Sequence, residues 1–257
     1  MKKLVLIVVL IFGFVQANAT HQQDSVYHYR LLLTGASFAS SHNSWFEIGC
    51  RHLNAQPINR AVGGEAIVNA ANRMVEGTLY SFEELDQIDA LVIMHVHDRD
   101  VFRESALLPD YRDYPTPLTR DNYAIAYDYV IKRYLTECYE LRNNPKSRYY
   151  GSEIGKPAVI VLCTHWHDDR EVFNLSVRKL AEKWGFPLVE FDKNIGFSKN
   201  VLHPVTGEQP SLLYAKDSRT ADGVKYGWHP KRGEHEFIQQ RMAAIFVDLM
   251  KKVLPIK

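Results

Sequence analysis

The chain has 257 residues, with 31 lysines and arginines against 30 aspartates and glutamates, so its formal charge at pH 7 is +1. This near-neutral balance gives no attraction for nucleic acid or for an anionic membrane surface, and we expect neither as a partner. Three cysteines are too few and too scattered for a disulfide-built scaffold or a clustered zinc site.

The N-terminus has the pattern of a secretory signal peptide. Two lysines precede an apolar run from Leu4 to Val15, which leads to the small-residue sequence Ala17-Asn18-Ala19. A membrane helix needs about 20 apolar residues, and this run is shorter. We therefore predict a signal peptide over residues 1–19 and a secreted or periplasmic mature chain over residues 20–257, with no integral membrane segment after cleavage. The mature length fits a single α/β domain.

Apolar runs that end at turn residues alternate with segments of helical spacing along the mature chain. The predicted strands are Tyr29 to Thr34, Pro57 to Val62, Ala90 to Met94, Ala158 to Cys163 and Pro187 to Phe191. The predicted helices are Trp45 to Leu53, Ala66 to Val75, Asn122 to Leu141, Glu171 to Trp184 and about Glu234 to Val253. The order is that of repeated strand-helix units.

Strands that are apolar throughout, each followed by a helix, predict a parallel sheet with helices on both faces. We expect a three-layer α/β/α architecture with a flavodoxin-like sheet of five parallel strands. Ligands of such sheets bind beyond the carboxyl ends of the strands. The segment 194–228 has turn residues and little periodicity, so we predict a long functional loop over one end of the sheet.

Three short segments at predicted strand or helix ends could carry chemistry. Ser37 follows the first strand at a turn that would expose its hydroxyl, although a helix-capping serine is a common alternative. Gly63 and Gly64 follow the second strand and could present a backbone amide to a ligand, or simply form a tight turn. His229 precedes the last helix and could reach back over the sheet, although a single histidine is more often structural.

Together these segments resemble the sequence blocks of the SGNH, or GDSL-type, hydrolases. Gly35-Ala36-Ser37 resembles their Gly-Asp-Ser block, with Ala36 in place of the aspartate. Asn59 to Gly64 resembles their Asn-x-Gly-x-x-Gly block, and His229-Pro230 resembles the histidine block before the final helix. The resemblance runs from about residue 29 to residue 253.

The resemblance implies that Ser37 is the nucleophile and His229 the general base of an ester hydrolase. The backbone amides of Ser37 and Gly64 would hold the oxyanion. The family's third donor is an asparagine in a Gly-x-Asn-Asp block, but this chain has His95-Val96-His97-Asp98 there. His97 stands in the place of the asparagine, and a neutral imidazole can still donate one hydrogen bond.

The acid that orients the base also departs from the pattern. The family has Asp-x-x-His, whereas Tyr226 stands three residues before His229. Asp222 would serve if residues 225–228 loop out; otherwise a backbone carbonyl would hold His229 and leave a Ser-His dyad. We predict Asp222.

Histidines at two predicted strand ends support a competing interpretation. His95, His97, His165 and His167 are ligands that suit zinc, and residues 164–169 resemble the His-x-His-x-Asp-His signature of metallo-β-lactamase-fold enzymes. The likeness fails at Arg170, where the next histidine should be. A metal-dependent hydrolase therefore stays an alternative to the serine enzyme, for which we expect no metal and no cofactor.

The predicted function is an exported serine esterase that removes acyl groups, such as acetyl, from a carbohydrate. Aromatic and polar side chains at the strand ends and in the long loop would bind the sugar. Tyr214, Lys216 and Arg219 could add polar contacts from that loop. The predicted substrate-binding residues are His95, His165, His167, Trp166 and Trp228. An SGNH-like glycan-binding domain without turnover is the third alternative, because two blocks are altered.

Overall fold

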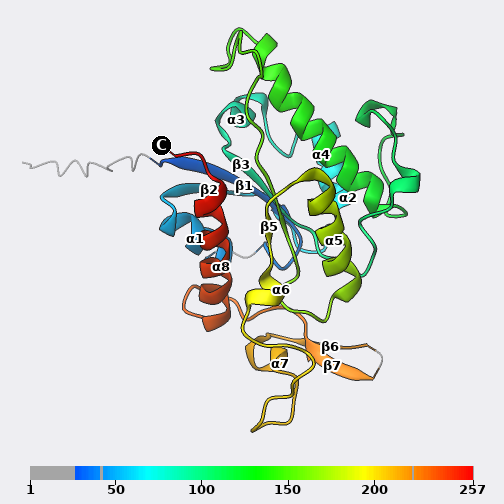
Figure 1. Ribbon diagram of the computed structural model, residues 1–257, viewed down its shortest axis with the longest axis vertical. Coiled ribbons are helices and arrows are strands. Elements are labelled where there is room, and N and C mark those ends of the chain that lie inside the picture. Colours follow the sequence, from blue (N-terminus) through cyan, green and yellow to red (C-terminus); the bar gives the residue numbers. More distant parts are fainter. Residues whose placement is uncertain (1–26, 41–42, 222, 257) are drawn as a thin grey trace, which may run out of the picture.

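The computed structural model describes residues 27–40, 43–221 and 223–256 (Figure 1). The predicted signal peptide lies outside these residues. The main sheet consists of β1 (Tyr29–Gly35), β2 (Ala55–Asn59), β3 (Ala90–Met94), β4 (Ile160–Cys163) and β5 (Leu188–Val189). All its strands pair in parallel, in the order β2-β1-β3-β4-β5. This is the flavodoxin-like order, and it confirms the predicted fold class.

The three central strands form the middle of the core because they carry almost only apolar side chains. β3 and β4 are buried along their whole length, and β1 is buried from Leu31 onward. The register pairs Gly35 at the end of β1 with Met94 at the end of β3. The residues that follow these two strands, including Ser37 and His97, therefore emerge at the same edge of the sheet.

Helices cover both faces of the sheet, as right-handed crossovers require (Figure 1). α1 (Trp45–His52) packs against α8 (Phe237–Val253) on one face, where Trp45, Phe46 and Phe246 are fully buried. On the other face α2 (Ile67–Val75) packs against α4 (Tyr123–Glu140), with α5 (Glu171–Trp184) beside them. Other short helical elements are α3 (Phe82–Gln87), α6 (Phe191–Asn194) and the 3-10 turns Glu104–Ala106, Tyr111–Asp113 and Leu141–Asn143.

The segment 194–228 is more ordered than the predicted loop. It contains α7 (Ser211–Tyr214) and an antiparallel hairpin of β6 (Ser218–Ala221) and β7 (Val224–Gly227). Figure 1 shows the hairpin beyond the carboxyl ends of the sheet strands. Its strands are short and β6 is wholly exposed, so the sequence carries no hydrophobic alternation there. The Asp-Gly pair at 222–223 is nevertheless a hairpin signal.

Among the described residues, no helix has the length and apolar character needed to cross a membrane.

Candidate active site

Ser37 lies on a tight turn immediately after β1. The turn passes so close to β3 that a Cβ on Gly35 would lie 2.9 Å from the carbonyl oxygen of Met94 and 2.9 Å from the Cβ of Ala39. A glycine is therefore needed there. The indole N–H of Trp45 donates to the carbonyl of Phe38 at 3.2 Å, which ties the turn to α1. These contacts hold Ser37 half-buried at the carboxyl edge of the sheet.

His229 reaches Ser37 from the other end of the chain. Its Nε2 lies 2.9 Å from Ser37 Oγ, and its ring packs on that of Phe38 with 5.2 Å between centroids. The backbone carbonyl of His229 accepts from the amide of Lys216 at 2.7 Å, so the segment before α8 is fixed against the chain that leads into β6. The two side chains therefore lie within hydrogen-bond reach, as the sequence predicts.

Asp217 is the carboxylate beside His229. Its Oδ2 and Oδ1 lie 2.8 and 3.0 Å from Nδ1, and Oδ1 also accepts from the backbone N–H of His229 at 2.8 Å. Partial burial alone would raise the pKa of Asp217, but the hydrogen bonds from His229 outweigh it and hold this pKa below its usual value. With Nδ1 donating to a carboxylate, Nε2 is left to accept the proton of Ser37.

Sequence reasoning missed Asp217 because it missed the hairpin. The β6–β7 register pairs Ser218 with Gly227, and the amide of Trp228 donates to the carbonyl of Asp217 at 2.8 Å. The residue before β6 therefore lies opposite the residues after β7. The predicted acid, Asp222, lies outside the described residues.

Asn59 fixes the glycine loop against the serine turn. Its side-chain amide donates to the carbonyl of Ala39 at 2.9 Å and to Glu47 at 2.7 Å, while its oxygen accepts from the amide of Ala61 at 3.0 Å. The amide of Val62 also donates to the carbonyl of Gly35 at 3.0 Å. One side chain thus joins the two loops that the sequence predicts to form the oxyanion site.

Both predicted oxyanion amides are free to bind a ligand. The backbone N–H groups of Ser37 and Gly64 make no hydrogen bond within the part of the chain that the structure describes. A Cβ on Gly63 would lie 4.0 Å from the Cβ of Ser37, so this loop borders the serine. Gly64 has φ +83°, which favours glycine. Its carbonyl accepts from Arg120 at 2.9 Å.

His97, the predicted third donor, follows β3 and packs on Tyr123 with 4.7 Å between ring centroids. Burial, together with the positive charges of Arg120 and Arg170, lowers its pKa to about 4. The ring is therefore neutral at pH 7. Its Nε2 is buried and has no hydrogen-bond partner among the described residues. A neutral imidazole of this kind has one N–H to offer, which is what the predicted role requires.

The other predicted substrate-binding residues at these strand ends lie under the site. His95, His165, His167 and Trp166 are fully buried. His95 Nε2 hydrogen-bonds with Thr34 Oγ1 at 2.9 Å, and His167 Nε2 donates to the carbonyl of Gly227 at 2.7 Å. This burial does not fit the direct substrate contact predicted for them. They instead brace the strand ends and the base of the hairpin.

Trp228 is partly exposed, but both faces of its ring are covered. The guanidinium carbons of Arg170 and Arg219 each lie 3.7 Å from the ring centroid, and two groups at that height fit only on opposite faces. A sugar ring therefore cannot stack on Trp228 as the sequence prediction assumes. The indole instead carries two cations beside His229.

Comparison with known proteins places the chain in a family. Residues 28–254 match the domain of unknown function DUF5040. The chain belongs to this family. No curated protein matches it in sequence.

Several solved structures are similar to this DUF5040 chain. An α/β hydrolase from the metagenome of Lake Arreo, Spain, is 15% identical, with 89% of this chain and 97% of that chain covered and a TM-score of 0.43. A lipolytic G-D-S-L family protein from Veillonella parvula is 11% identical, with 88% and 100% covered and a TM-score of 0.42. A catalytic mutant of an acetylxylan esterase from Geobacillus stearothermophilus is 13% identical, with 87% and 94% covered and a TM-score of 0.45.

The four histidines of the metal alternative do not form a ligand cluster in the DUF5040 domain. Among the residues that the structure describes, the one group of at least three potential ligand side chains within 4.8 Å is His167, Asp168 and Asp169. His167 Nδ1 contacts Asp169 Oδ2 at 3.0 Å, and Asp168 accepts from Ser198 Oγ at 2.9 Å and from the amide of Lys199 at 3.0 Å. Asp168 thus joins the loop after β4 to the segment that follows α6.

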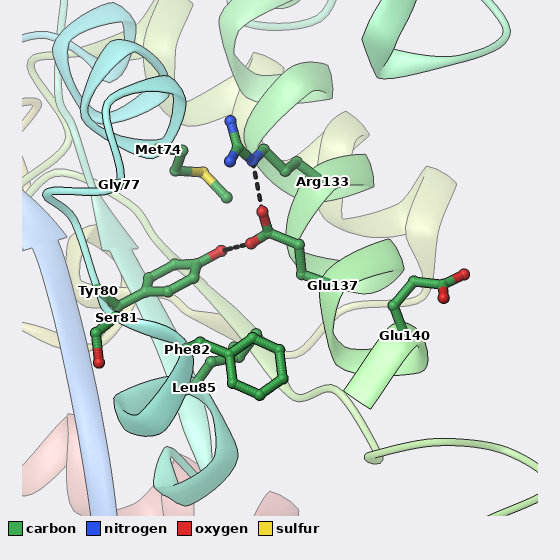
Figure 2. Close-up of a pocket in the computed structure, with 9 residues that line it drawn as sticks. All are labelled: Met74, Gly77, Tyr80, Ser81, Phe82, Leu85, Arg133, Glu137 and Glu140. Atoms are coloured by element: carbon green, nitrogen blue, oxygen red, sulfur yellow. Dashed lines mark hydrogen bonds and ion pairs between the residues drawn. The ribbon is translucent and has the colours of Figure 1, made fainter. Parts of the chain in front are cut away.

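A separate pocket of about 280 Å³ lies between α2, α3 and α4 of the DUF5040 domain (Figure 2). Glu137 accepts there from Tyr80 at 2.6 Å and from Arg133 at 2.7 Å. Burial and the adjacent carboxylate raise the pKa of Tyr80 well above its usual value. None of the predicted site residues lines this pocket.

Proposed function

We propose that the chain is an SGNH-type serine esterase with Ser37, His229 and Asp217 as its catalytic residues. One observation carries the proposal: a serine, a histidine and a carboxylate lie in hydrogen-bond contact in that order, at 2.9 and 2.8 Å, although 192 residues separate the serine from the histidine. The histidine nitrogen that is free of the carboxylate faces the hydroxyl. This is the arrangement that general-base activation of a serine requires.

The proposed reaction has two steps. In the first, Ser37 Oγ attacks the ester carbonyl, His229 Nε2 takes the hydroxyl proton, and the same proton passes to the departing alcohol. In the second, a water molecule attacks the acyl-serine, His229 takes its proton and returns it to Ser37, and the carboxylic acid leaves. Asp217 keeps Nδ1 protonated and stabilises the imidazolium that forms in each step.

The oxyanion of each tetrahedral intermediate would lie against the amides of Ser37 and Gly64. Loss of one such donor typically costs about 10²–10³ in turnover. His97 would be the third donor, in place of the family's asparagine. Arg120 adds positive charge next to this loop because it binds the carbonyl of Gly64.

We extend the proposal to an exported enzyme that removes acyl groups from a carbohydrate. The leader pattern over residues 1–19 supports export. Arg120 on the carbonyl of Gly64 and Arg232 on that of Ser37, at 3.3 Å, give the site polar surroundings that suit a hydrophilic ester better than a lipid. Acetate is the acyl group that we would test first.

The test uses the purified mature protein with 4-nitrophenyl acetate and a fluorophosphonate probe. We expect hydrolysis, covalent labelling and full activity in EDTA, with Ser37→Ala abolishing both reactions while the circular dichroism spectrum is unchanged. Activity lost on chelation, with stoichiometric zinc by elemental analysis, would support the metal hydrolase instead. Absence of turnover and labelling, together with measurable affinity for a glycan, would identify a binding domain.

A further inference from the structure

The residues around Trp228 form an arginine sandwich, which we define as Arg170, Trp228 and Arg219. It lies directly beside the proposed catalytic base, because Trp228 precedes His229 in the chain and its ring lies 5.3 Å from that of Phe38, the residue after the nucleophile. Arg170 comes from the loop before α5 and Arg219 from β6. The hairpin thus places the guanidinium of Arg219 near that of Arg170, which the main domain supplies.

The arginine sandwich carries more positive charge than its neighbours neutralise. Asp98 is its one carboxylate partner among the described residues: it pairs with Nη1 of Arg170 and lies 3.8 Å from Nη1 of Arg219. Two cations and one shared anion leave a net positive charge. Asp217 is already bound to His229 and is not available to cancel it.

Arg170 is the inner member of the sandwich. Its side chain is only 6% exposed, and its Nε and Nη2 are buried without a hydrogen-bond partner in the described chain. Burial lowers its pKa to about 10, so the guanidinium stays charged at pH 7. A buried cation with two unpaired donors lowers the stability of the fold, so its presence calls for a role other than folding. One purpose it can serve is to set a positive potential at the surface next to the base.

Arg219 is the outer member and the one that a ligand can reach. Half of its side chain is exposed, and within the described part of the chain its one ion pair is the loose contact with Asp98. Stacking on the indole fixes the plane of the guanidinium, so that its N–H edge stays free to bind two oxygens of one carboxylate. Carboxylates match this edge, whereas a neutral hydroxyl forms a weaker, uncharged contact.

We propose that the arginine sandwich makes the site specific for esters of acidic sugars, in which a carboxylate on the alcohol part binds Arg219 while the acyl group lies against Ser37. This inference rests on the proposed esterase function and adds its substrate class. Asp98 then competes with the substrate for Arg219. Removing Asp98 should therefore improve selection of the acidic ester, which no purely structural role of the cluster predicts.

The experiment compares acetate release from methyl glucuronoside and methyl glucoside that carry the acetyl group at the same position. These esters differ only in a carboxylate against a hydroxymethyl group. We expect kcat/KM to be at least about tenfold higher for the acidic ester, and Arg219→Gln to remove most of this preference. The preference should shrink with added salt because the contact is exposed.

Three further variants sharpen the test. Asp98→Asn should increase the preference, and Arg219→Lys should retain only part of it because the charge remains but the planar fork is lost. Lys225→Gln is the matched control: it removes a cation from the same hairpin but pairs in register with Thr220, so it faces away from Arg219. It should leave the preference unchanged.

The outcomes separate this inference from the proposed function. Equal rates on the two sugar esters, a preference for the neutral one, or activity on 4-nitrophenyl acetate with neither sugar ester cleaved would each overturn the acidic-sugar assignment and leave the esterase intact. A preference that survives Arg219→Gln would also overturn it. No turnover of any ester and no fluorophosphonate labelling would refute the esterase itself.

Discussion

Replacing His95 with glutamine should make the protein's stability less sensitive to acid. His95 is fully buried under the site, and burial, with a smaller effect from His97, lowers its pKa to about 3. Its pKa in the unfolded chain is about 6.5. Acid therefore favours the unfolded state, which binds this proton first. At this residue the free energy of unfolding therefore has its full value above pH 6.5 and decreases as the pH falls from 6.5 toward 3.

The size of this effect follows from the two pKa values. Between pH 7 and pH 5 the unfolded chain becomes almost fully protonated at this position while the folded chain does not, which costs about 2 kcal/mol of unfolding free energy from His95 alone. This figure depends little on the folded pKa, provided that it lies well below 5. His165 is also fully buried and has its pKa shifted in the same direction, so wild-type protein should lose still more.

Urea unfolding at pH 7 and pH 5 measures the prediction. The free energy lost between these two pH values should be about 2 kcal/mol smaller for His95→Gln than for the wild type, even if the variant is less stable at both. His235→Gln is the control, because the His235 side chain is 94% exposed. Identical losses in wild type and His95→Gln would show that His95 is not held neutral by the fold.

Two more substitutions, each paired with a comparison variant, test the site and the turn that carries it. Asp217→Ala should lower kcat by about 10³–10⁴-fold because His229 loses the partner that sets its tautomer. Asp222→Ala should leave kcat within a few fold of the wild type. The reverse ranking in steady-state assays would make Asp222, the acid that the sequence predicts, the partner of His229. Gly35→Ala should reduce stability by about 1–3 kcal/mol because its Cβ meets backbone at 2.9 Å. Gly63→Ala, whose nearest atom would be 3.8 Å away, should unfold in urea almost as the wild type does.

The three central strands, β1, β3 and β4, could be predicted from sequence because they are almost wholly buried. β3 has the predicted bounds, and α5 begins at Glu171 and ends at Trp184 as its periodicity and the following glycine indicate. β5 is shorter than its apolar run, which continues into α6. α3 was not predicted, because six residues give too little periodicity, although Ser81 and Glu84 form a capping pair at its start.

The same distinction between regular elements and short exposed ones applies to the candidate site. Ser37 could be predicted because it follows β1, and His229 because it precedes α8, and the sequence indicates both of these elements. Asp217 could not, since its place depends on a short, exposed hairpin whose strand register brings it opposite Trp228. A search for hairpin turns, rather than for a fixed spacing from the histidine, would have proposed it.

The altered third block shows why residue type alone did not reveal a role. A glycine in the place of His95 would leave space under the strand ends, whereas His95 fills it, bonds with Thr34 on the neighbouring strand and accepts from Tyr127 through its carbonyl at 3.0 Å. The imidazole therefore joins the end of β1 to the residue that follows β3. Its polarity serves the sheet and not the substrate. A bond between two strand ends fixes where the following residues emerge. His95 therefore positions Ser37 and His97 relative to each other without a direct role in the reaction.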